Sequence, residues 1–324
     1  MISDPLPFDI YGELPGGTTV LEASAGTGKT YTVAALTARV IAEGVADLNQ
    51  MLLVTFGRMA TNELRLRVRE RLVSVEDSLA AAVRQREPHR PLSDLDAFIC
   101  TGDMDELRRR HARVSRALAD FDAATIATTH EFCLQMLDGL GVLGDREPHA
   151  TIVEHLTDLT REVTTDLYLR RYAANGAPPM SYDEALDVAN QAVEAVHARL
   201  VPAGLGSDDP TGSSERVRFA SAVREEVERR KRAANLCTYD DMLTRLRDAL
   251  ADPEYGPAAA ERLRQRYRIV MVDEFQDTDP VQWEILRRAF HQHCMLILIG
   301  DPKQAIYAFR GADVFSYLDA VDQA

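Results

Sequence analysis

Short apolar runs, each followed by a helical pattern, dominate the distribution of hydrophobic residues along the chain. The runs are rich in Val, Ile, Leu and Thr, and they have the length of buried strands. Four runs are predicted strands, with a fifth between the second and third: residues 18–21, 51–55, 125–128, 269–272 and 295–299. Buried strands that alternate with helices predict an α/β fold, in which helices cover both faces of a parallel sheet.

Two long stretches lack strand character, and in both of them apolar residues recur at helical spacing among many charges. These stretches are residues 73–119 and 145–250. We therefore expect a sheet domain (1–75, 120–145 and 250–324) and an inserted, mostly helical subdomain (76–119 and 146–249). Within the larger stretch, residues 202–214 are rich in Pro, Gly, Ser and Asp, which predicts a loop.

A glycine-rich loop follows the first predicted strand and opens a helix. It reads Ala23-Ser24-Ala25-Gly26-Thr27-Gly28-Lys29-Thr30. Its glycines let backbone N–H groups turn toward phosphates, Lys29 can reach the β and γ oxygens, and Thr30 can ligate Mg²⁺. Ala23 stands where the usual motif has its first glycine. Lysine is rare in this chain, with three against 34 arginines, so Lys29 indicates a specific role.

Two adjacent carboxylates, Asp273 and Glu274, follow the strand at 269–272. Open parallel sheets bind ligands at the carboxyl ends of their strands. Asp273 would hold the Mg²⁺ that bridges the β and γ phosphates, and Glu274 would polarise the attacking water. Acidic turns after strands are common, so this interpretation depends on the phosphate loop and on the Gln276-Asp277 pair that follows.

The last predicted strand runs into a segment that combines polar groups, two aromatic residues and an arginine. It reads Gly300-Asp301-Pro302-Lys303-Gln304-Ala305-Ile306-Tyr307-Ala308-Phe309-Arg310-Gly311-Ala312-Asp313. Gln304 could contact the γ-phosphate, and Tyr307 and Phe309 could stack on unpaired bases. Packing in the core explains the two aromatic residues equally well.

These three motifs, together with segments at 55–65, 128–133 and 238–243, occur in the order seen in superfamily-one DNA helicases of the UvrD and RecB type. The resemblance spans essentially the whole chain and is greatest to the RecB type. It implies a RecA-like P-loop fold and an ATP- and Mg²⁺-dependent translocase that moves 3′ to 5′ on single-stranded DNA. It also implies a role in double-strand-break repair, with single-stranded and duplex-end DNA and RecC-like and RecD-like subunits as partners.

The resemblance also implies roles for individual residues. Near the nucleotide it places phosphate and metal ligands at Lys29, Thr30 and Asp273, the catalytic base at Glu274, the γ-phosphate sensor at Gln304 and a motif arginine at Arg310. Along the single-strand path it places Thr55, Phe56, Thr129, His130, Tyr307 and Phe309. His130 could instead simply begin a helix, and the spacing of residues 238–241 suits a capping box, which gives Asp240 and Asp241 a structural role first.

The chain departs from the family pattern in three places. Residues 57–59 read Gly-Arg-Met where relatives more often have small polar residues, and 129–131 read Thr-His-Glu in place of Ile-His-Gly. No glutamine precedes the loop at the position that reads adenine in many relatives, so base selectivity stays open. The arginines of 108–116 could grip duplex phosphates, although a solvated helix face is the favoured explanation.

The resemblance implies a second RecA-like domain, and in the RecB type a nuclease, beyond residue 324. An arginine from the second domain contributes about 10³- to 10⁵-fold to phosphoryl transfer, so we expect this half-motor to bind ATP and hydrolyse little. One alternative is a non-hydrolysing ATP- and DNA-binding module that serves in complex assembly. A weaker alternative is a phosphate-loop enzyme unrelated to DNA.

Composition narrows the class of protein further. The net charge of −14 argues against a basic nucleic-acid coat and leaves only local arginine clusters for phosphates. The four cysteines have no Cys-x-x-Cys spacing, which suggests neither a zinc site nor a disulfide framework. The N-terminus has no signal-peptide pattern and no apolar run is long enough to span a membrane, so we expect a cytoplasmic protein with no membrane contact.

Overall fold

The computed structural model divides the chain into two compact units. Unit 1 comprises Met1–Asp145 and Arg245–Ala324, and unit 2 comprises Arg146–Thr244. The structure describes residues 6–24, 28–86, 92–140, 151–173, 178–195, 200–201, 212–304 and 314–324.

Unit 1 is built on a five-stranded sheet in which every neighbouring pair is parallel, with the order β1-β7-β6-β2-β3. The strands are β1 (Thr18–Glu22), β2 (Met51–Thr55), β3 (Thr125–Thr128), β6 (Ile269–Val272) and β7 (Met295–Gly300). All five predicted strands are confirmed, and β1 and β7 each extend one residue further. In the three central strands, β2, β6 and β7, almost all side chains are buried. This burial explains why the sequence shows continuous apolar runs there.

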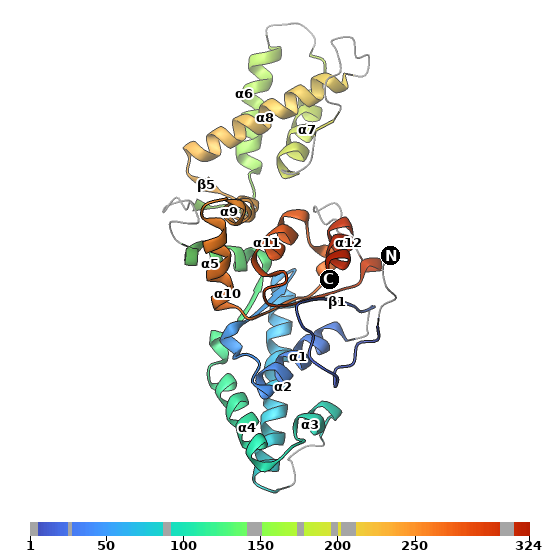
Figure 1. Ribbon diagram of the computed structural model, residues 1–324. Coiled ribbons are helices and arrows are strands. Elements are labelled where there is room, and N and C mark those ends of the chain that lie inside the picture. The colour runs from blue at the N-terminus through green and yellow to red at the C-terminus, as the bar shows by residue number, and fades with distance from the viewer. Residues whose placement is uncertain are drawn as a thin grey trace. The chain divides into compact units, whose positions relative to one another are not determined.

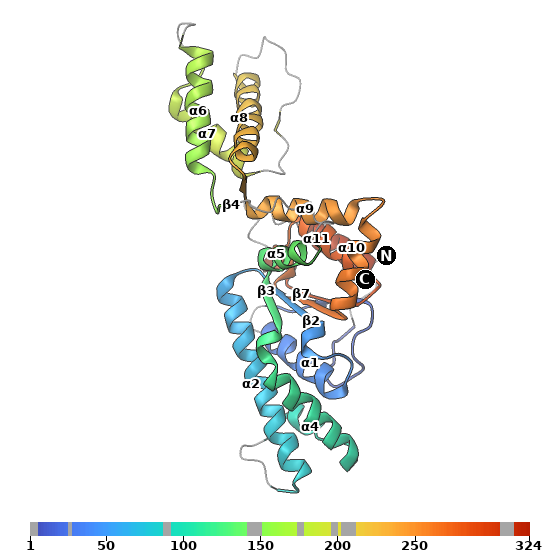
Figure 2. The same ribbon diagram turned by 90° about the vertical axis from the view of Figure 1, so that its left-hand side faces the viewer.

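Helices cover both faces of this sheet, as the sequence predicts (Figure 1). One face carries α1 (Lys29–Glu43), α2 (Arg58–Val83), α3 (Asp94–Ile99) and α4 (Met104–Ala119). The other carries α5 (Thr129–Leu140), α10 (Gly256–Arg266), α11 (Pro280–Phe290) and α12 (Val314–Gln323), and both views show the two groups on opposite sides (Figure 2). Alternate strand residues such as Leu53, Met271 and Ile297 pack into the core beneath α1–α4.

The position of residues 76–119 differs from the expected helical subdomain. They belong to unit 1, because α3, α4 and the end of α2 bury apolar side chains in the same core as the sheet. Leu79, Ile99 and Val114 share that core with Leu53 and are at most 1% exposed. The helical spacing shows that one face is buried, but it does not show which surface covers that face.

Unit 2 has its own hydrophobic core between three helices, α6 (Thr157–Tyr172), α7 (Tyr182–Glu194) and α8 (Ser213–Ala233). Phe219 and Val223 are completely buried at its centre. The unit also contains two short parallel strands that the sequence did not predict, β4 (Thr151–Ile152) and β5 (Leu236–Cys237). Most of the expected loop at 202–214 lies outside the described residues, and its last two residues begin α8.

The helix α9 (Tyr239–Ala251) begins at the expected capping box. Asp241 accepts from the Thr238 backbone N–H at 2.7 Å, and the Asp241 N–H donates to the Thr238 hydroxyl at 3.2 Å. Asp241 also pairs with the buried Lys231 at 2.7 Å, which gives this carboxylate the structural role the sequence suggests. The remaining short helices are the 3₁₀ turns η1 (Leu48–Gln50), η2 (Phe121–Ala123), η4 (Phe275–Asp277) and η5 (Pro302–Gln304). Within the described residues, no helix combines the length and apolar composition needed to cross a bilayer.

Candidate nucleotide and DNA site

The carboxyl ends of all five sheet strands lie along one edge, because every strand is parallel to its neighbours. Most of the sequence motifs begin at these ends, whereas the segment at 238–243 follows β5. The phosphate loop follows β1, the carboxylate pair follows β6, and the Gln304 segment follows β7. The expected DNA-contacting residues follow β2 and β3. Open α/β sheets bind ligands at this edge.

The phosphate loop leads into α1 through Gly28, which has a φ of 93° in the left-handed region that favours glycine. In this fully described 15-residue helix, the first turn has neither an acidic side chain nor a side-chain cap, so its N-terminal N–H groups remain available for an anion. The Ala23 N–H donates to the Gly300 carbonyl at 3.0 Å, which ties the loop to the end of β7. Ala25, Gly26 and Thr27 lie outside the described residues.

Lys29 forms an ion pair with Glu274, which lies 245 residues further along the chain. The Lys29 side chain is only 10% exposed and that of Glu274 is 35% exposed. The structure thus brings together two residues that the sequence assigned to the same nucleotide. Within this pair the ammonium and the carboxylate neutralise each other.

Glu274 is held in an uncommon backbone conformation, with φ 54° and ψ 40°. Non-glycine residues in this region are strained, and such strain clusters at functional sites. The neighbouring Asp273 carboxylate accepts from the Glu274 N–H at 2.9 Å. Burial, and after it the Glu274 charge, raises the pKa of Asp273 to about 6, although the Lys29 charge acts in the opposite direction. A buried carboxylate that is short of positive charge is a suitable ligand for a cation.

Asp277 is a second buried carboxylate with too little positive charge around it. Burial and the Glu274 charge raise its pKa to about 6, and its Oδ1 atom is buried without a hydrogen-bond partner. The described residues contain no cluster of three or more His, Cys, Asp or Glu side chains that could enclose a metal. Mg²⁺ in phosphate sites is usually held by one or two protein ligands plus phosphate and water. Thr30 and Asp273 therefore fit Mg²⁺ that arrives with a nucleotide.

Gln276 connects two motifs through its side chain, although the sequence pattern assigns it no role of its own. Its Nε2 donates to Glu274 Oε2 at 2.7 Å, and its Oε1 accepts from the Asp301 N–H at 2.9 Å. Asp301 in turn accepts from the Gln304 side-chain amide at 2.5 Å. The only signal in the sequence was that Gln276 lies within the acidic motif.

The expected DNA contacts after β2 are only partly supported by the geometry. Thr55 is 1% exposed, and its hydroxyl lies 2.6 Å from that of Thr61. The Thr61 hydroxyl donates to the Gly57 carbonyl at 3.1 Å, so Thr55 and Thr61 together hold the turn into α2. The Thr55 side chain is therefore not placed to contact DNA, which corrects the sequence expectation. Phe56 at the same edge is half-buried.

After β3, the residues Thr129 and His130 form the first turn of α5. Thr128 and Glu131 make a reciprocal pair of bonds, in which the Thr128 N–H donates to Glu131 at 2.9 Å and the Glu131 N–H donates to the Thr128 hydroxyl at 3.2 Å. This reciprocal pair is a capping box, and it explains why the chain has Glu131 where the family pattern has glycine. The proposed contacts Tyr307, Phe309 and Arg310 lie outside the described residues.

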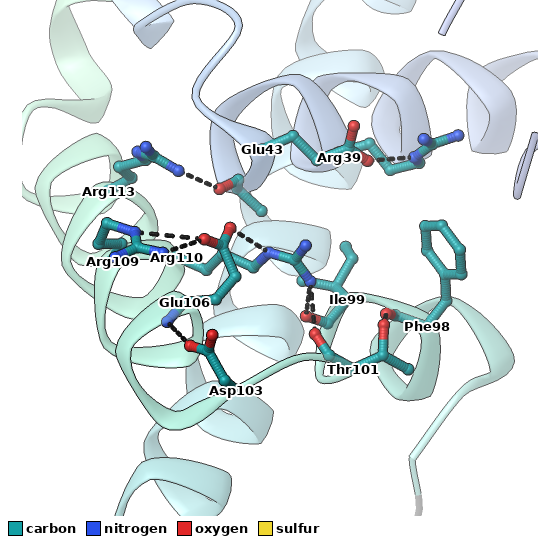
Figure 3. A network of polar contacts seen from close by, with 11 residues as sticks. Arg39, Glu43, Phe98, Ile99, Thr101, Asp103, Glu106, Arg109, Arg110 and Arg113 are labelled. Atoms are coloured by element: carbon teal, nitrogen blue, oxygen red, sulfur yellow. Dashed lines mark hydrogen bonds and ion pairs between the residues drawn. The ribbon is translucent and has the colours of Figure 1, made fainter. Parts of the chain in front are cut away.

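Two arginines of the run on α4, Arg110 and Arg113, bind backbone carbonyls and so stabilise the fold (Figure 3). Arg110 donates to the carbonyls of Ile99 and Thr101 at 2.7 and 2.9 Å. Arg113 donates to the Ala42 carbonyl at 3.0 Å. The acidic partners of the run are Asp105 for Arg108, and Glu106 for Arg109 and Arg110. These contacts leave little charge to hold duplex phosphates.

A family model described as the UvrD/REP helicase N-terminal domain matches residues 11–324. The chain belongs to this family. Membership accounts for the RecA-like sheet and for the order of the motifs along its carboxyl edge. The resemblance to UvrD- and RecB-type helicases is thereby confirmed.

Curated relatives of the chain include RecB proteins. The chain is 51% identical over 320 residues to RecBCD enzyme subunit RecB of Mycolicibacterium smegmatis, covering 98% of this chain and 28% of that protein. For RecB of Mycobacterium tuberculosis the identity is 46% over 323 residues, with 98% and 28% covered. ATP-dependent DNA helicase UvrD2 of Mycobacterium bovis is 28% identical over 305 residues, with 94% and 37% covered. The chain thus spans less than a third of the length of these two RecB relatives.

Proposed function

We propose that this chain is the N-terminal motor portion of a RecB-type DNA helicase, which binds ATP with Mg²⁺ and moves along single-stranded DNA. The observation that carries the proposal is the ion pair of Lys29 with Glu274 at the carboxyl edge of one sheet, to which Gln304 is joined through Asp301 and Gln276. The relatives named as RecB and as an ATP-dependent DNA helicase support the same activity.

Each nucleotide-site residue has a role that its position permits. The N–H groups that begin α1 and the Lys29 ammonium bind the β and γ phosphates. Thr30 and Asp273 hold Mg²⁺, which when bound neutralises charge on those phosphates. Lys29 leaves Glu274 as it takes up the phosphates, and Glu274 is then free to orient and deprotonate the attacking water. Gln304 faces the γ-phosphate from the end of β7.

Single-stranded DNA passes along the ends of β2, β3 and β7 in this proposal. Phe56, Thr129 and His130 contact the strand from the first two ends, and Tyr307 and Phe309 supply ring faces for unpaired bases. Movement from 3′ to 5′, double-strand-break repair, duplex-end DNA and the RecC-like and RecD-like subunits rest on the resemblance and on the names of the relatives.

The same resemblance assigns phosphoryl-transfer arginines to a second RecA-like domain, so this portion alone binds ATP but turns it over slowly. The second candidate function is the non-hydrolysing ATP- and DNA-binding module, which uses the same binding residues. In that function the chain is a binding module that serves in assembly without hydrolysis.

The first experiment measures the steady-state ATPase rate of the 324-residue chain with and without single-stranded DNA, beside binding of a fluorescent ATP analogue. We expect nucleotide binding that Lys29→Ala abolishes, DNA binding by fluorescence anisotropy, and little turnover. Joining the chain to the remainder of a RecB-type protein restores turnover in a motor but not in an assembly module. Nucleotide binding without any DNA binding would instead identify a phosphate-loop enzyme unrelated to DNA.

A further inference from the structure

A hollow of about 360 Å³ lies at the amino ends of three neighbouring strands, on the opposite edge of the sheet from the nucleotide site. Its lining includes Gly17 before β1, Ile269 at the start of β6 and Met295 at the start of β7. The strands β6 and β7 have four and six residues, so the two edges lie about 13–20 Å apart. None of the described residues that line this hollow belongs to a nucleotide or DNA motif.

Two basic segments meet at this amino edge. Residues 261–268 and 284–293 together contain six arginines and two histidines against two glutamates, in a chain whose net charge is −14. Both glutamates accept hydrogen bonds from side chains on their own helices. Burial lowers the pKa of His291, and the charges of Arg287 and His293 lower it further. The amino edge is therefore a local concentration of positive charge in an acidic protein.

Arg264 and Arg268 both line the hollow, but they are engaged differently. Arg264 donates to the Ala289 carbonyl at 2.7 Å and to the Arg288 carbonyl at 3.1 Å, so it closes the end of α11. Arg268 follows the end of α10 and is exposed, and its side chain makes no hydrogen bond or ion pair with a described residue. The exposed His293 side chain in the same lining also has no such partner. Helix capping thus explains Arg264 but not Arg268.

The chemistry of the lining indicates which ligand would fit. A guanidinium without a partner can bind a phosphate group through two parallel N–H···O bonds. A phosphate monoester carries a charge of about −1.5 to −2 at pH 7, which matches the charges of Arg264 and Arg268 better than a single carboxylate does. Val45, Ile269 and Met295 add apolar side chains to the lining. The volume also lies within the range of about 300–1,000 Å³ that is typical of small-molecule sites.

We propose that this hollow binds a phosphate monoester with a small apolar or aromatic body. Arg268 binds the phosphate group bidentately, Arg264 contributes its charge, and His293 donates a further hydrogen bond. Val45 and Met295 contact the body of the ligand. The site does not depend on the proposed function, because no residue of the nucleotide site takes part in it.

Cys294 provides a local readout for binding, because it lies in the same lining. Its half-buried thiol donates to the Tyr267 carbonyl at 3.2 Å. Burial raises the pKa of this thiol, so its alkylation by neutral iodoacetamide is measured at mildly alkaline pH. A ligand in the hollow should slow alkylation of Cys294 but not of Cys100, a half-buried cysteine at the end of α3. Peptide mass spectrometry measures both rates in the same 324-residue chain.

Three probes separate the parts of the proposed ligand. Phenyl phosphate combines a phosphate with a ring, benzoate has the same ring on a singly charged carboxylate, and inorganic phosphate has no ring. We expect phenyl phosphate to halve the alkylation rate of Cys294 at about 1 mM or below. Benzoate and inorganic phosphate should each need at least about fivefold more, because each lacks one of the two contacts.

Substitution of Arg268 tests the phosphate contact. Arg268→Met should raise the half-protecting concentration of phenyl phosphate by about tenfold or more, the effect of losing a charge-assisted pair of bonds. Arg266→Met is the matched control, because Arg266 lies over the Tyr267 ring at 5.1 Å and is not part of the lining. It removes the same charge two residues away and should change that concentration by less than about threefold. Thermal melting shows whether each variant is folded.

Each contrary result overturns a stated part of the inference. Absence of protection by all three probes would exclude the site, and equal protection by benzoate would exclude the preference for phosphate. Inorganic phosphate as effective as phenyl phosphate would exclude the apolar contact. Wild-type protection in folded Arg268→Met, or an equal loss in Arg266→Met, would show that Arg268 does not hold the phosphate. Lys29→Ala should keep the protection of Cys294, and loss of protection there would assign the effect to the phosphate loop.

Discussion

Asp273 is a proposed Mg²⁺ ligand whose negative charge destabilises the folded chain. The residue is 7% exposed and adjoins Glu274, and its pKa is raised to about 6 in the folded chain against 3.8 when unfolded. A raised carboxylate pKa means that the folded state binds more protons between those values, so folding stability decreases as the pH rises from about 4 to about 6. At neutral pH the full loss of folding stability caused by the Asp273 charge is present.

Asp273→Asn should therefore stabilise the nucleotide-free chain. The amide removes the buried charge and its oxygen still accepts from the Glu274 N–H. Two pKa units correspond to at most about 3 kcal/mol of unfolding free energy at pH 7. Urea denaturation without Mg²⁺ should show this gain at pH 7 and lose it below about pH 4. The same variant should lose Mg²⁺-dependent nucleotide affinity.

Asp301→Asn provides a control of opposite sign. Its hydrogen bond with Gln304 and the Lys303 N–H lower the pKa of Asp301 below its ordinary value, so its charge is favoured in the folded chain. Removal of that charge should lower stability at neutral pH. Stabilisation by both substitutions would show that the loss of any acidic group, and not the burial of Asp273, accounts for the gain.

Gly300 provides a steric test of the close contact between β7 and η4. Gly300→Ala places a methyl group within 2.7 Å of Gln276 Oε1, so we expect a loss of about 1–3 kcal/mol in the free energy of unfolding. Gly16→Ala is the matched control, because nothing lies within 4 Å of a Cβ there. Denaturant titration of both variants measures the difference, and equal stabilities would mean that β7 and η4 can separate without cost.

Arginine side chains close several helix C-termini, which helps to explain why this chain uses 34 arginines and three lysines. Arg113 donates to the end of α1, Arg110 to α3 and Arg264 to α11. In unit 2, Arg224 donates to the Ala192 and Ala195 carbonyls at the end of α7. The last carbonyls of a helix lack intrahelical partners, and a planar guanidinium can bind two of them at once.

Arg113→Met should lower the unfolding free energy by about 1–3 kcal/mol, since the bond to the Ala42 carbonyl is charge-assisted and partly buried. Arg116→Met on the same helix is exposed and should change stability by less than about 0.5 kcal/mol. Chemical denaturation of the two variants provides the comparison. Similar losses would indicate that helix charge, and not the cap on α1, is responsible.

The sequence predicted the strands well because their burial is visible locally. Continuous apolar runs located all five sheet strands to within one residue, and their parallel order placed the motifs at one edge. The helices at 76–119 were assigned to the wrong unit, because an amphipathic pattern does not identify its packing partner. The Lys29–Glu274 pair, the Gln276 link and the burial of Thr55 depend on contacts between distant segments, which no local pattern contains.

At the scale of the whole molecule, the two units differ in how many proposed site residues they contain. Every described residue proposed for the nucleotide site lies in unit 1, whereas unit 2 has a separate core around Phe219. The backbone enters and leaves unit 2 through β4 and β5, whose residues Thr151 and Leu236 are paired neighbours. Paired strands lie about 4.8 Å apart and each residue of a parallel strand advances about 3.3 Å, so a linker of three residues is long enough to bridge the start of β4 and the end of β5.

Replacement of residues 151–237 by Gly-Gly-Ser should therefore leave a folded chain. The core of unit 1 and the groups around Lys29 and Glu274 remain complete, so affinity for the Mg²⁺–ATP analogue should stay within about threefold of the wild type, an effect of less than about 0.7 kcal/mol. Fluorescence titration and a cooperative thermal transition check both points. A folded variant that no longer binds nucleotide would show that unit 2 supports the site, and an unfolded variant would show that unit 1 depends on unit 2 for its stability.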